Sequence, residues 1–234
     1  MKPIFNVLWK SLNHLPSAWL LVVQFILLIL SVLAYGNLSY RTAIWLIGVM
    51  LLLMIAKVIR QTPVFTILGL SFVAGAIVFS LFILFGMRET WVHVIAHAFE
   101  AAAYFCAAYG LLRYMFHDRY LTKDELFAAG AVFTLLAWGF AFLYNICQLL
   151  YPESFLSPNG QPLQAWFDLL FLSFSVQSAT GLSDLVPVSP LARMLVMIQM
   201  FVGVMYLAII VSRLIALQYI HFLPKSKQDH QDKT

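Results

Sequence analysis

The chain consists mainly of apolar runs long enough to cross a membrane, and this feature constrains its fold more than any other. A helix needs about 20 apolar residues to span the hydrocarbon core of a bilayer. Of the 234 residues, 62% are apolar and only 10% are charged, whereas soluble domains carry about a quarter charged residues. This composition excludes a cytosolic enzyme, a disordered chain and a nucleic-acid-binding protein. Because backbone polar groups must be satisfied inside lipid, we expect an all-α integral membrane protein.

Six apolar runs predict six transmembrane helices separated by short polar segments. They cover residues 18–35, 42–56, 64–85, 91–115, 126–150 and 191–222. Residues 1–16 differ, because Lys2 and Lys10 stand among apolar residues at helical spacing. This pattern is typical of an amphipathic helix on the membrane surface, with a frayed terminus as the alternative. The two cysteines, Cys106 and Cys147, are too few for a disulfide framework or a cysteine-based zinc site.

A seventh apolar run, Leu163–Ser178, is too short to be a further span. Its 16 residues extend about 24 Å at about 1.5 Å per residue, which is less than the thickness of the hydrocarbon core. A helix that enters and leaves the membrane on the same side suits this length, because such backbone is tolerated where protein or water surrounds it. We therefore expect a re-entrant helix between the fifth and sixth spans.

The distribution of basic residues supports this topology. With the N-terminus in the cytoplasm, only Arg41, Arg88 and Arg193 of the 14 basic residues fall on the outer side. Cytoplasmic segments of membrane proteins carry such an excess of lysine and arginine. A seventh full span would move the basic residues of the C-terminal tail, 224–234, outside, so that topology is rejected. We expect a multi-pass protein of the plasma membrane with both termini in the cytoplasm.

The polar strip after the short run resembles a known pore signature. It reads Ser178-Ala179-Thr180-Gly181-Leu182-Ser183-Asp184, followed after two residues by Pro187. The tetrameric potassium-channel pore family has Thr-Thr-Val-Gly-Tyr-Gly-Asp at this place, again followed after two residues by Pro. The resemblance covers about 100 residues, 120–219, and is to the bacterial two-helix pore channels. Within it Gly203, which lies 20 residues after Ser183, stands where the family has its inner-helix glycine hinge.

The resemblance implies a fold, a function and a division of the chain. The implied pore domain, 118–223, consists of a helix, a pore loop and a second helix, preceded by a four-helix membrane domain, 17–117. One chain holds one pore loop, so a closed homotetramer is needed to surround a conduction path. The implied function is passive conduction of a monovalent cation, K⁺ or Na⁺, through a filter formed by residues 179–184, in a bacterial inner membrane and without a cofactor.

Departures from the signature predict weak or altered K⁺ selectivity. The family filter coordinates K⁺ through backbone carbonyls, and both of its glycines adopt backbone angles that other residues disfavour. Ser183 replaces the second glycine, and we expect a left-handed conformation there to cost about 1–2 kcal/mol. Ala179 and Leu182 lack the hydroxyl groups of the family's Thr and Tyr, while Thr180 and Ser183 offer hydroxyls to partly hydrated ions. For Asp184, the resemblance implies a side-chain brace behind the filter.

The fourth predicted span carries an ionisable stripe instead of gating charges. Voltage sensors place several Arg or Lys residues in this helix, but here no basic residue precedes Arg113. His93, His97 and Glu100 are spaced by four and three residues and so share one helical face. A pH or proton sensor, a metal site and a hydrogen-bonded contact between helices all fit this stripe.

Two other functions remain open on the sequence alone. A non-conducting pseudo-channel, which serves as a regulatory or scaffold subunit, is suggested by the altered filter. A proton-coupled transporter or membrane enzyme that uses the His93, His97 and Glu100 stripe is the other, although neither inverted repeats nor a second catalytic cluster is visible. We expect a non-enzymatic channel.

Overall fold

The computed structural model of the protein describes residues 16–33, 66–87, 89–117, 123–158 and 160–222. These residues are mostly helical, as the composition predicts. The helices are α2 (Pro16–Leu33), α4 (Thr66–Leu84), α5 (Thr90–His117), α6 (Lys123–Leu150), α7 (Trp166–Gln177) and α8 (Pro190–Phe222). Two strands of two residues each, β1 (Phe155–Leu156) and β2 (Val186–Pro187), lie before and after α7 in the chain.

Four of the described helices are long and apolar enough to cross a membrane. Their spanning segments are Ile67–Leu84, Thr90–Phe116, Asp124–Leu150 and Pro190–Ala216, and each coincides closely with a predicted span. Helix α2 is a shorter apolar helix in the first predicted run. The predicted span 42–56, the surface helix over residues 1–15 and the tail 224–234 lie outside the described residues. The chain is therefore a multi-pass membrane protein, and the number of six spans stays a prediction.

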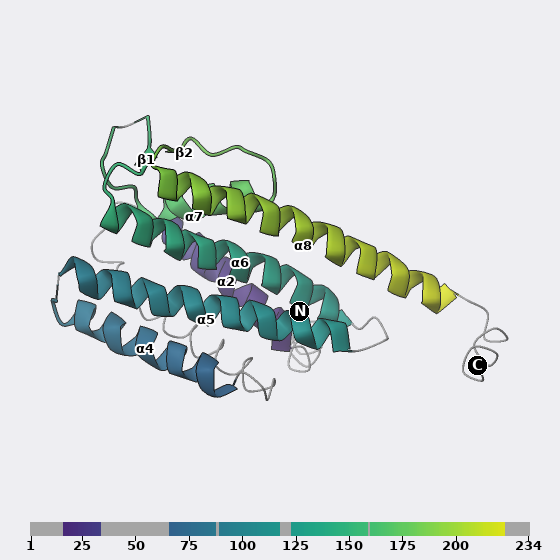
Figure 1. Ribbon diagram of the computed structural model, residues 1–234. Coiled ribbons are helices and arrows are strands. Elements are labelled where there is room, and N and C mark those ends of the chain that lie inside the picture. The colour runs from purple at the N-terminus through teal and green to yellow at the C-terminus, as the bar shows by residue number, and fades with distance from the viewer. Residues whose placement is uncertain (1–15, 34–65, 88, 118–122, 159, 223–234) are drawn as a thin grey trace, which may run out of the picture.

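Helix α6 is the centre of the bundle. In Figure 1, α4, α5, α6 and α8 run side by side, while α2 and α7 lie behind them. Helix α6 contacts α2, α5, α7 and α8, whereas α4 packs on α5. In α6, 72% of the residues of the spanning segment are buried, whereas in α8 only 28% of them are. One side of α8 is therefore open in the single chain.

Small side chains allow α5 and α6 to pack closely. Buried alanines occur along both helices: Ala96, Ala101, Ala103, Ala107 and Ala108 in α5, and Ala128, Ala131, Ala137 and Ala141 in α6. In lipid, where the hydrophobic effect does not drive helices together, such residues let the backbones approach each other.

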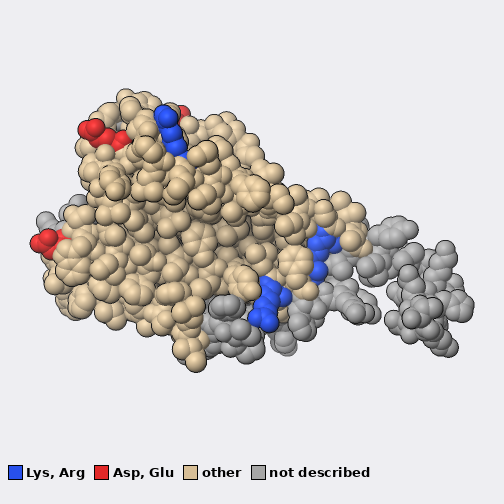
Figure 2. Space-filling view, in the orientation of Figure 1, with Lys and Arg blue, Asp and Glu red and all other residues tan. Residues whose placement is uncertain are grey.

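Figure 2 shows the exterior of the molecule, in which the middle of the visible face carries no charged side chain.

Strands β1 and β2 form a short antiparallel ladder at one end of the bundle (Figure 1), with Phe155 opposite Pro187 and Leu156 opposite Val186. The sequence did not predict this short pair, which leaves the fold mostly helical. The strands pair because the segment after α6 lies beside the extended chain that leads into α8. Phe155 is buried against Tyr144 of α6, with ring centroids 5.4 Å apart, which holds the ladder on the bundle.

A buried charge joins three helices at the opposite end. The guanidinium of Arg213 on α8 lies 3.8 Å from the carboxylate of Glu125 on α6 and 4.8 Å from the ring centroid of Phe116 on α5. It also donates to the carbonyl oxygen of Met115. Because a buried charge is costly without a partner, these contacts tie the end of α8 to its neighbours.

The carboxylate of Asp124 caps the first turn of α2. The backbone N–H and the hydroxyl of Ser17 donate to its two oxygens at 3.3 and 3.0 Å, and both side chains are buried. A helix N-terminus leaves N–H groups without partners and favours a negative charge. This contact therefore joins α2 to the central helix.

Replacing Asp124 with alanine is expected to destabilise the protein. The substitution leaves buried donors of Ser17 without an acceptor, which typically costs about 1–3 kcal/mol. Thermal unfolding of the purified protein in detergent measures the effect, with Ser71→Ala as the control, since the exposed Ser71 hydroxyl bonds to Leu68 in its own helix. Equal unfolding midpoints for the two variants would contradict the proposed cap.

Candidate functional site

Helix α7 has the length expected of a half-helix. It contains 12 residues, or about 18 Å at about 1.5 Å per residue, and occupies Trp166–Gln177 within the predicted run. It contacts α6 and α8, and its buried residues include apolar and polar side chains. The chain then returns through residues 178–185 to β2. A short helix followed by an extended return, between two spanning helices, is the arrangement predicted for a pore loop.

Ser175, near the end of α7, binds the returning strip from one side. Its carbonyl oxygen accepts hydrogen bonds from the backbone N–H groups of Thr180 and Gly181 at 3.1 and 3.3 Å. Its hydroxyl oxygen accepts one from the N–H of Ser183 at 3.1 Å. Three amides of the strip are thus satisfied by one residue of the helix.

The carbonyl oxygens of residues 178–183, unlike these three amides, are not used in hydrogen bonds among the described residues. In the part of the chain that the structure describes, they accept none of the backbone or side-chain hydrogen bonds. Backbone acceptors normally find a partner, and carbonyl oxygens are the ligands that replace the hydration shell of a cation in a potassium filter. The strip therefore offers a run of oxygen ligands that a cation or water can use.

The hydroxyl groups of the strip bond to the chain itself. Thr180 Oγ1 donates to the carbonyl of Ser175 at 3.3 Å and lies 3.0 Å from Ser178 Oγ. Ser183 Oγ accepts the N–H of Leu185 at 3.2 Å. The hydroxyls of Thr180 and Ser183, which the sequence predicted as ligands of partly hydrated ions, therefore form hydrogen bonds within the chain. The backbone carbonyls are thus the better candidates for ion ligands.

The backbone strain lies at a different residue from the one predicted. Ala179 has φ +57° and Gly181 has φ +65°, whereas Ser183 is not among the described residues with positive φ. The predicted left-handed strain at Ser183 is therefore wrong, because its N–H bonds to Ser175 in an ordinary backbone conformation. Within the strip, Ala179 combines the left-handed region with a Cβ, at a typical cost of about 1–2 kcal/mol.

The outer surface of the strip is exposed in the single chain. Ala179, Thr180, Gly181 and Asp184 are exposed, and Leu182 keeps 70% of its surface accessible. Asp184 has no hydrogen bond or ion pair to the described residues, so the brace expected of it stays a prediction. Within one chain, Ser175 holds the back of the strip instead.

A buried polar cluster supports α7 from behind. Gln199 of α8 donates through Nε2 to the carbonyl and the hydroxyl of Ser173, at 3.0 and 2.7 Å, and to Gln177 Oε1 at 3.1 Å. The hydroxyl of Tyr144 on α6 donates to Gln199 Oε1. The sequence analysis did not single out Ser173, Ser175 or Gln177 as site residues. Their signal in the sequence is that they are polar residues inside the apolar run Leu163–Ser178.

Gly203 lies at a close approach between α8 and α7. A Cβ at this position would be 2.6 Å from the carbonyl oxygen of Gln177 and 3.1 Å from its Cα. Both are backbone atoms, so a side chain has no room without moving a helix. The predicted hinge role is untested, but the contact gives an independent physical reason for glycine here.

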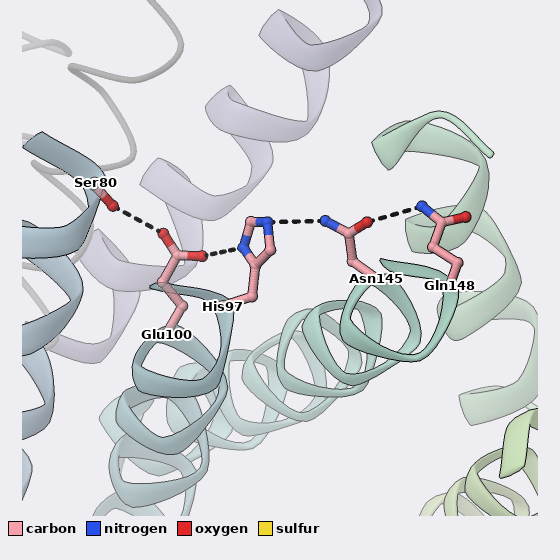
Figure 3. Close-up of polar contacts among 5 residues, drawn as sticks. All are labelled: Ser80, His97, Glu100, Asn145 and Gln148. Atoms are coloured by element: carbon pink, nitrogen blue, oxygen red, sulfur yellow. Dashed lines mark hydrogen bonds and ion pairs between the residues drawn. The ribbon is translucent and has the colours of Figure 1, made fainter. Parts of the chain in front are cut away.

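The predicted stripe on α5 is drawn into a line of polar contacts (Figure 3). His97 Nδ1 lies 2.8 Å from Glu100 Oε2, and Ser80 of α4 donates to Glu100 Oε1 at 3.3 Å. His97 Nε2 lies 3.0 Å from Asn145 Nδ2 on α6, and Gln148 Nε2 donates to Asn145 Oδ1 at 2.8 Å. The line thus crosses from α4 through α5 to α6.

The aromatic surroundings of His97 include the start of α7. Its ring stacks on Phe142 and Trp166, with centroids 5.6 and 6.5 Å away, and lies 6.3 Å from the His93 ring. Within the described segments, no group of three His, Cys, Asp or Glu residues is placed to hold a metal ion. His97 and Glu100 of the stripe therefore take part in a contact between helices.

The comparison with protein families agrees with this geometry. Residues 130–218 match the model of a family described as "Ion channel". The matched segment contains most of α6, all of α7 with the strip, and nearly all of α8. The match covers 89 of the 234 residues and makes this segment similar to an ion-channel domain. No curated protein and no solved structure matches the chain.

Replacing Gly203 with alanine is expected to destabilise the pore region. Alanine in place of glycine in a helix normally stabilises by about 1 kcal/mol, whereas overpacking costs about 1–3 kcal/mol. Because the new Cβ meets backbone of Gln177, we expect a lower unfolding temperature in detergent. Gly130→Ala is the control, since its Cβ meets the tip of the Leu21 side chain at 3.2 Å. A stabilised Gly203→Ala variant would argue against close packing.

Proposed function

We propose that the chain is the subunit of a homotetrameric cation channel that conducts K⁺ or Na⁺ passively with weak K⁺ selectivity. The observation that carries this proposal is the set of carbonyl oxygens in residues 178–183 without partners in the described chain. They lie on a strip between two membrane-spanning helices, α6 and α8, within the segment that matches an ion-channel family. In the proposed filter, residues 179–184 line the path.

The tetramer follows from the number of strips in one chain. A single strip offers ligands on one side of an ion, so several copies are needed to replace a hydration shell. A closed ring around a symmetry axis supplies them. The open side of α8 and the exposed Leu182 offer surfaces for neighbouring copies. This arrangement is expected in a bacterial inner membrane, with both termini cytoplasmic.

The weak selectivity follows from the chemistry of the strip. Ala179 supplies no hydroxyl for an ion, and its left-handed backbone lacks the freedom of glycine. Leu182, which replaces the family's Tyr, has no hydroxyl with which to anchor the outer strip. A strip with fewer anchors holds its carbonyls at less well-defined distances, so that it distinguishes K⁺ from Na⁺ less well.

The reversal potential of the purified protein in a planar bilayer tests this proposal. With K⁺ on one side and Na⁺ on the other, we expect a reversal potential near zero. With a KCl gradient, we expect a reversal potential of the sign that a cation-selective pore gives. The double variant Leu182→Tyr, Ser183→Gly restores family residues and is expected to move the first value toward the K⁺ equilibrium potential. A wild-type reversal already near that potential would overturn the weak selectivity.

The principal alternative is a non-conducting pseudo-channel, favoured by the strained Ala179 and the lost hydroxyls. It predicts no current from the wild-type protein alone, in any salt. A current that appears only in the restored variant would support this alternative and overturn conduction by the natural strip. Loss of flux in Glu100→Gln together with proton-coupled uptake would instead indicate the proton-coupled transporter.

Replacing Ser175 with alanine tests the contact behind the strip. The substitution keeps the carbonyl that binds Thr180 and Gly181 but removes the hydroxyl that binds the N–H of Ser183. Loss of a hydrogen bond worth about 1 kcal/mol changes a population about fivefold. We therefore expect a roughly fivefold lower open probability in single-channel recordings. Ser71→Ala should record like the wild type, and an unaltered Ser175→Ala would contradict the role of Ser175.

A further inference from the structure

The polar line through His97 continues into the segment that begins α7. Gln148 of α6 donates through Nε2 to the carbonyl of Gln164 at 3.1 Å, and its Oε1 accepts the N–H of Gln164 at 2.8 Å. Gln164 Nε2 in turn donates to the carbonyl of Phe155 in β1 at 3.0 Å. Gln164 stands two residues before Trp166, the first residue of α7. The line therefore joins α5 to the base of the proposed pore helix.

The backbone of Gln164 sets the direction of every bond in this line. Its N–H can only donate and its carbonyl can only accept, so Gln148 must present Oε1 to the first and Nε2 to the second. The other hydrogen of Nε2 then points to Asn145, which must present Oδ1. Asn145 is left with its Nδ2 facing His97 Nε2.

The orientation of Asn145 determines the protonation of His97. Because Asn145 Nδ2 is a donor, His97 Nε2 must be the acceptor and carry no proton. The ring proton of neutral His97 is then on Nδ1 and is donated to the carboxylate of Glu100 at 2.8 Å. The complete line is compatible with this one neutral tautomer only.

A second proton on His97 is incompatible with the line. Imidazolium Nε2–H is a donor and would face the Asn145 amide donor. Rotating the Asn145 amide would turn its Nδ2 toward Gln148 Nε2, and rotating Gln148 as well would turn Nε2 toward the N–H of Gln164. Since a backbone N–H cannot become an acceptor, at least one hydrogen bond along the line from His97 to Gln164 is lost.

We infer that His97 is a proton-binding site that regulates the pore, because its protonation breaks the line of hydrogen bonds that connects α5 through Asn145 and Gln148 to Gln164 at the start of α7. Acidification then loosens the base of the helix whose other end carries the strip, and conduction falls. The inference rests on the proposed channel function for its consequence, but the proton-dependent break in this line stands on the geometry alone. The proton reaches His97 from water, and no other reactant is needed.

The groups around His97 fit this assignment. On its own helix it faces Glu100 and the His93 ring, and Tyr104 lies one turn beyond Glu100. From α4 the Ser80 hydroxyl reaches Glu100. The α6 and α7 side chains in contact with the ring are uncharged, namely Asn145, Phe142 and Trp166. Glu100 is thus the charged partner of the imidazolium within the described contacts.

Hydrogen–deuterium exchange of the full-length protein at pH 7.5 and 5.5 tests the contact directly. After correction for the intrinsic rate, the protection of the Gln164 amide is expected to fall about fivefold at the lower pH, the factor for one hydrogen bond. His97→Gln does not titrate and should remove this dependence, whereas His93→Gln should retain it. Equal protection at both pH values in the wild type would overturn the inference.

Asn145→Asp gives a second, opposite readout. A carboxylate at this position accepts from Gln148 Nε2 and from imidazolium Nε2–H at once, so protonation no longer conflicts with the bonds to Gln164. The variant is therefore expected to keep the Gln164 amide protected at pH 5.5. If protection falls as in the wild type, the directional mechanism is overturned.

Ion flux from proteoliposomes separates this inference from the channel function. In the wild type and His93→Gln, flux is expected to fall about fivefold between pH 7.5 and 5.5, and in His97→Gln to stay constant. A flux with the same pH dependence in wild type and His97→Gln would overturn the regulation. No flux at any pH, with the exchange effect present, would instead overturn the channel and leave the proton-dependent contact supported.

Discussion

The region around α7 depends on one constraint: a helix too short to cross a membrane, packed between spanning helices, must end without leaving buried amides unsatisfied. Inside a bilayer, water is not available to satisfy them. Ser175 meets this need through its carbonyl and its hydroxyl, which together accept three amides of the returning strip. As a result, the amides face the helix and the carbonyls are left for other partners. The ligand set of the proposed filter is thus a consequence of how the helix end is satisfied.

Helix α7 is held at both ends by different neighbours. Its C-terminal end packs on α8 through Gly203 and is bonded to Gln199. Its N-terminal end is held through Gln164 by α6, and Trp166 stacks on His97 of α5. Helix α8 therefore contacts one end of α7, and helices α5 and α6 contact the other end. The position of α7 is thus fixed by two separate sets of contacts.

The long elements of this fold are predictable because hydrophobic length alone defines a membrane span. The boundaries of α4, α5, α6 and α8 follow from apolar runs, and the short α7 follows from its insufficient length. The position of the strip came from its resemblance to a pore signature. In each case the information is local in the sequence, within one run of residues.

The contacts that hold the site were not predictable in this way. Gln164 meets Gln148 across 16 residues, and Asn145 meets His97 across 48, so each partnership exists only after the helices pack. The stripe of His93, His97 and Glu100 was visible, but its partners on other helices were not. Ser183 illustrates the same limit, because its N–H bonds to the hydroxyl of Ser175 and its φ is not positive, whereas the resemblance to the pore signature predicted a left-handed conformation.

The open side of α8 has a consequence for how copies of this chain associate. In water, an exposed apolar helix would be driven into a partner by the hydrophobic effect, but lipid tails are as apolar as the Met, Ile and Val side chains along α8. Contacts through α8 must therefore compete with lipid on shape and packing alone. The balance between single chains and assemblies is then set by the ratio of protein to lipid in the bilayer, and diluting the membrane with lipid disperses the copies where diluting the buffer does not.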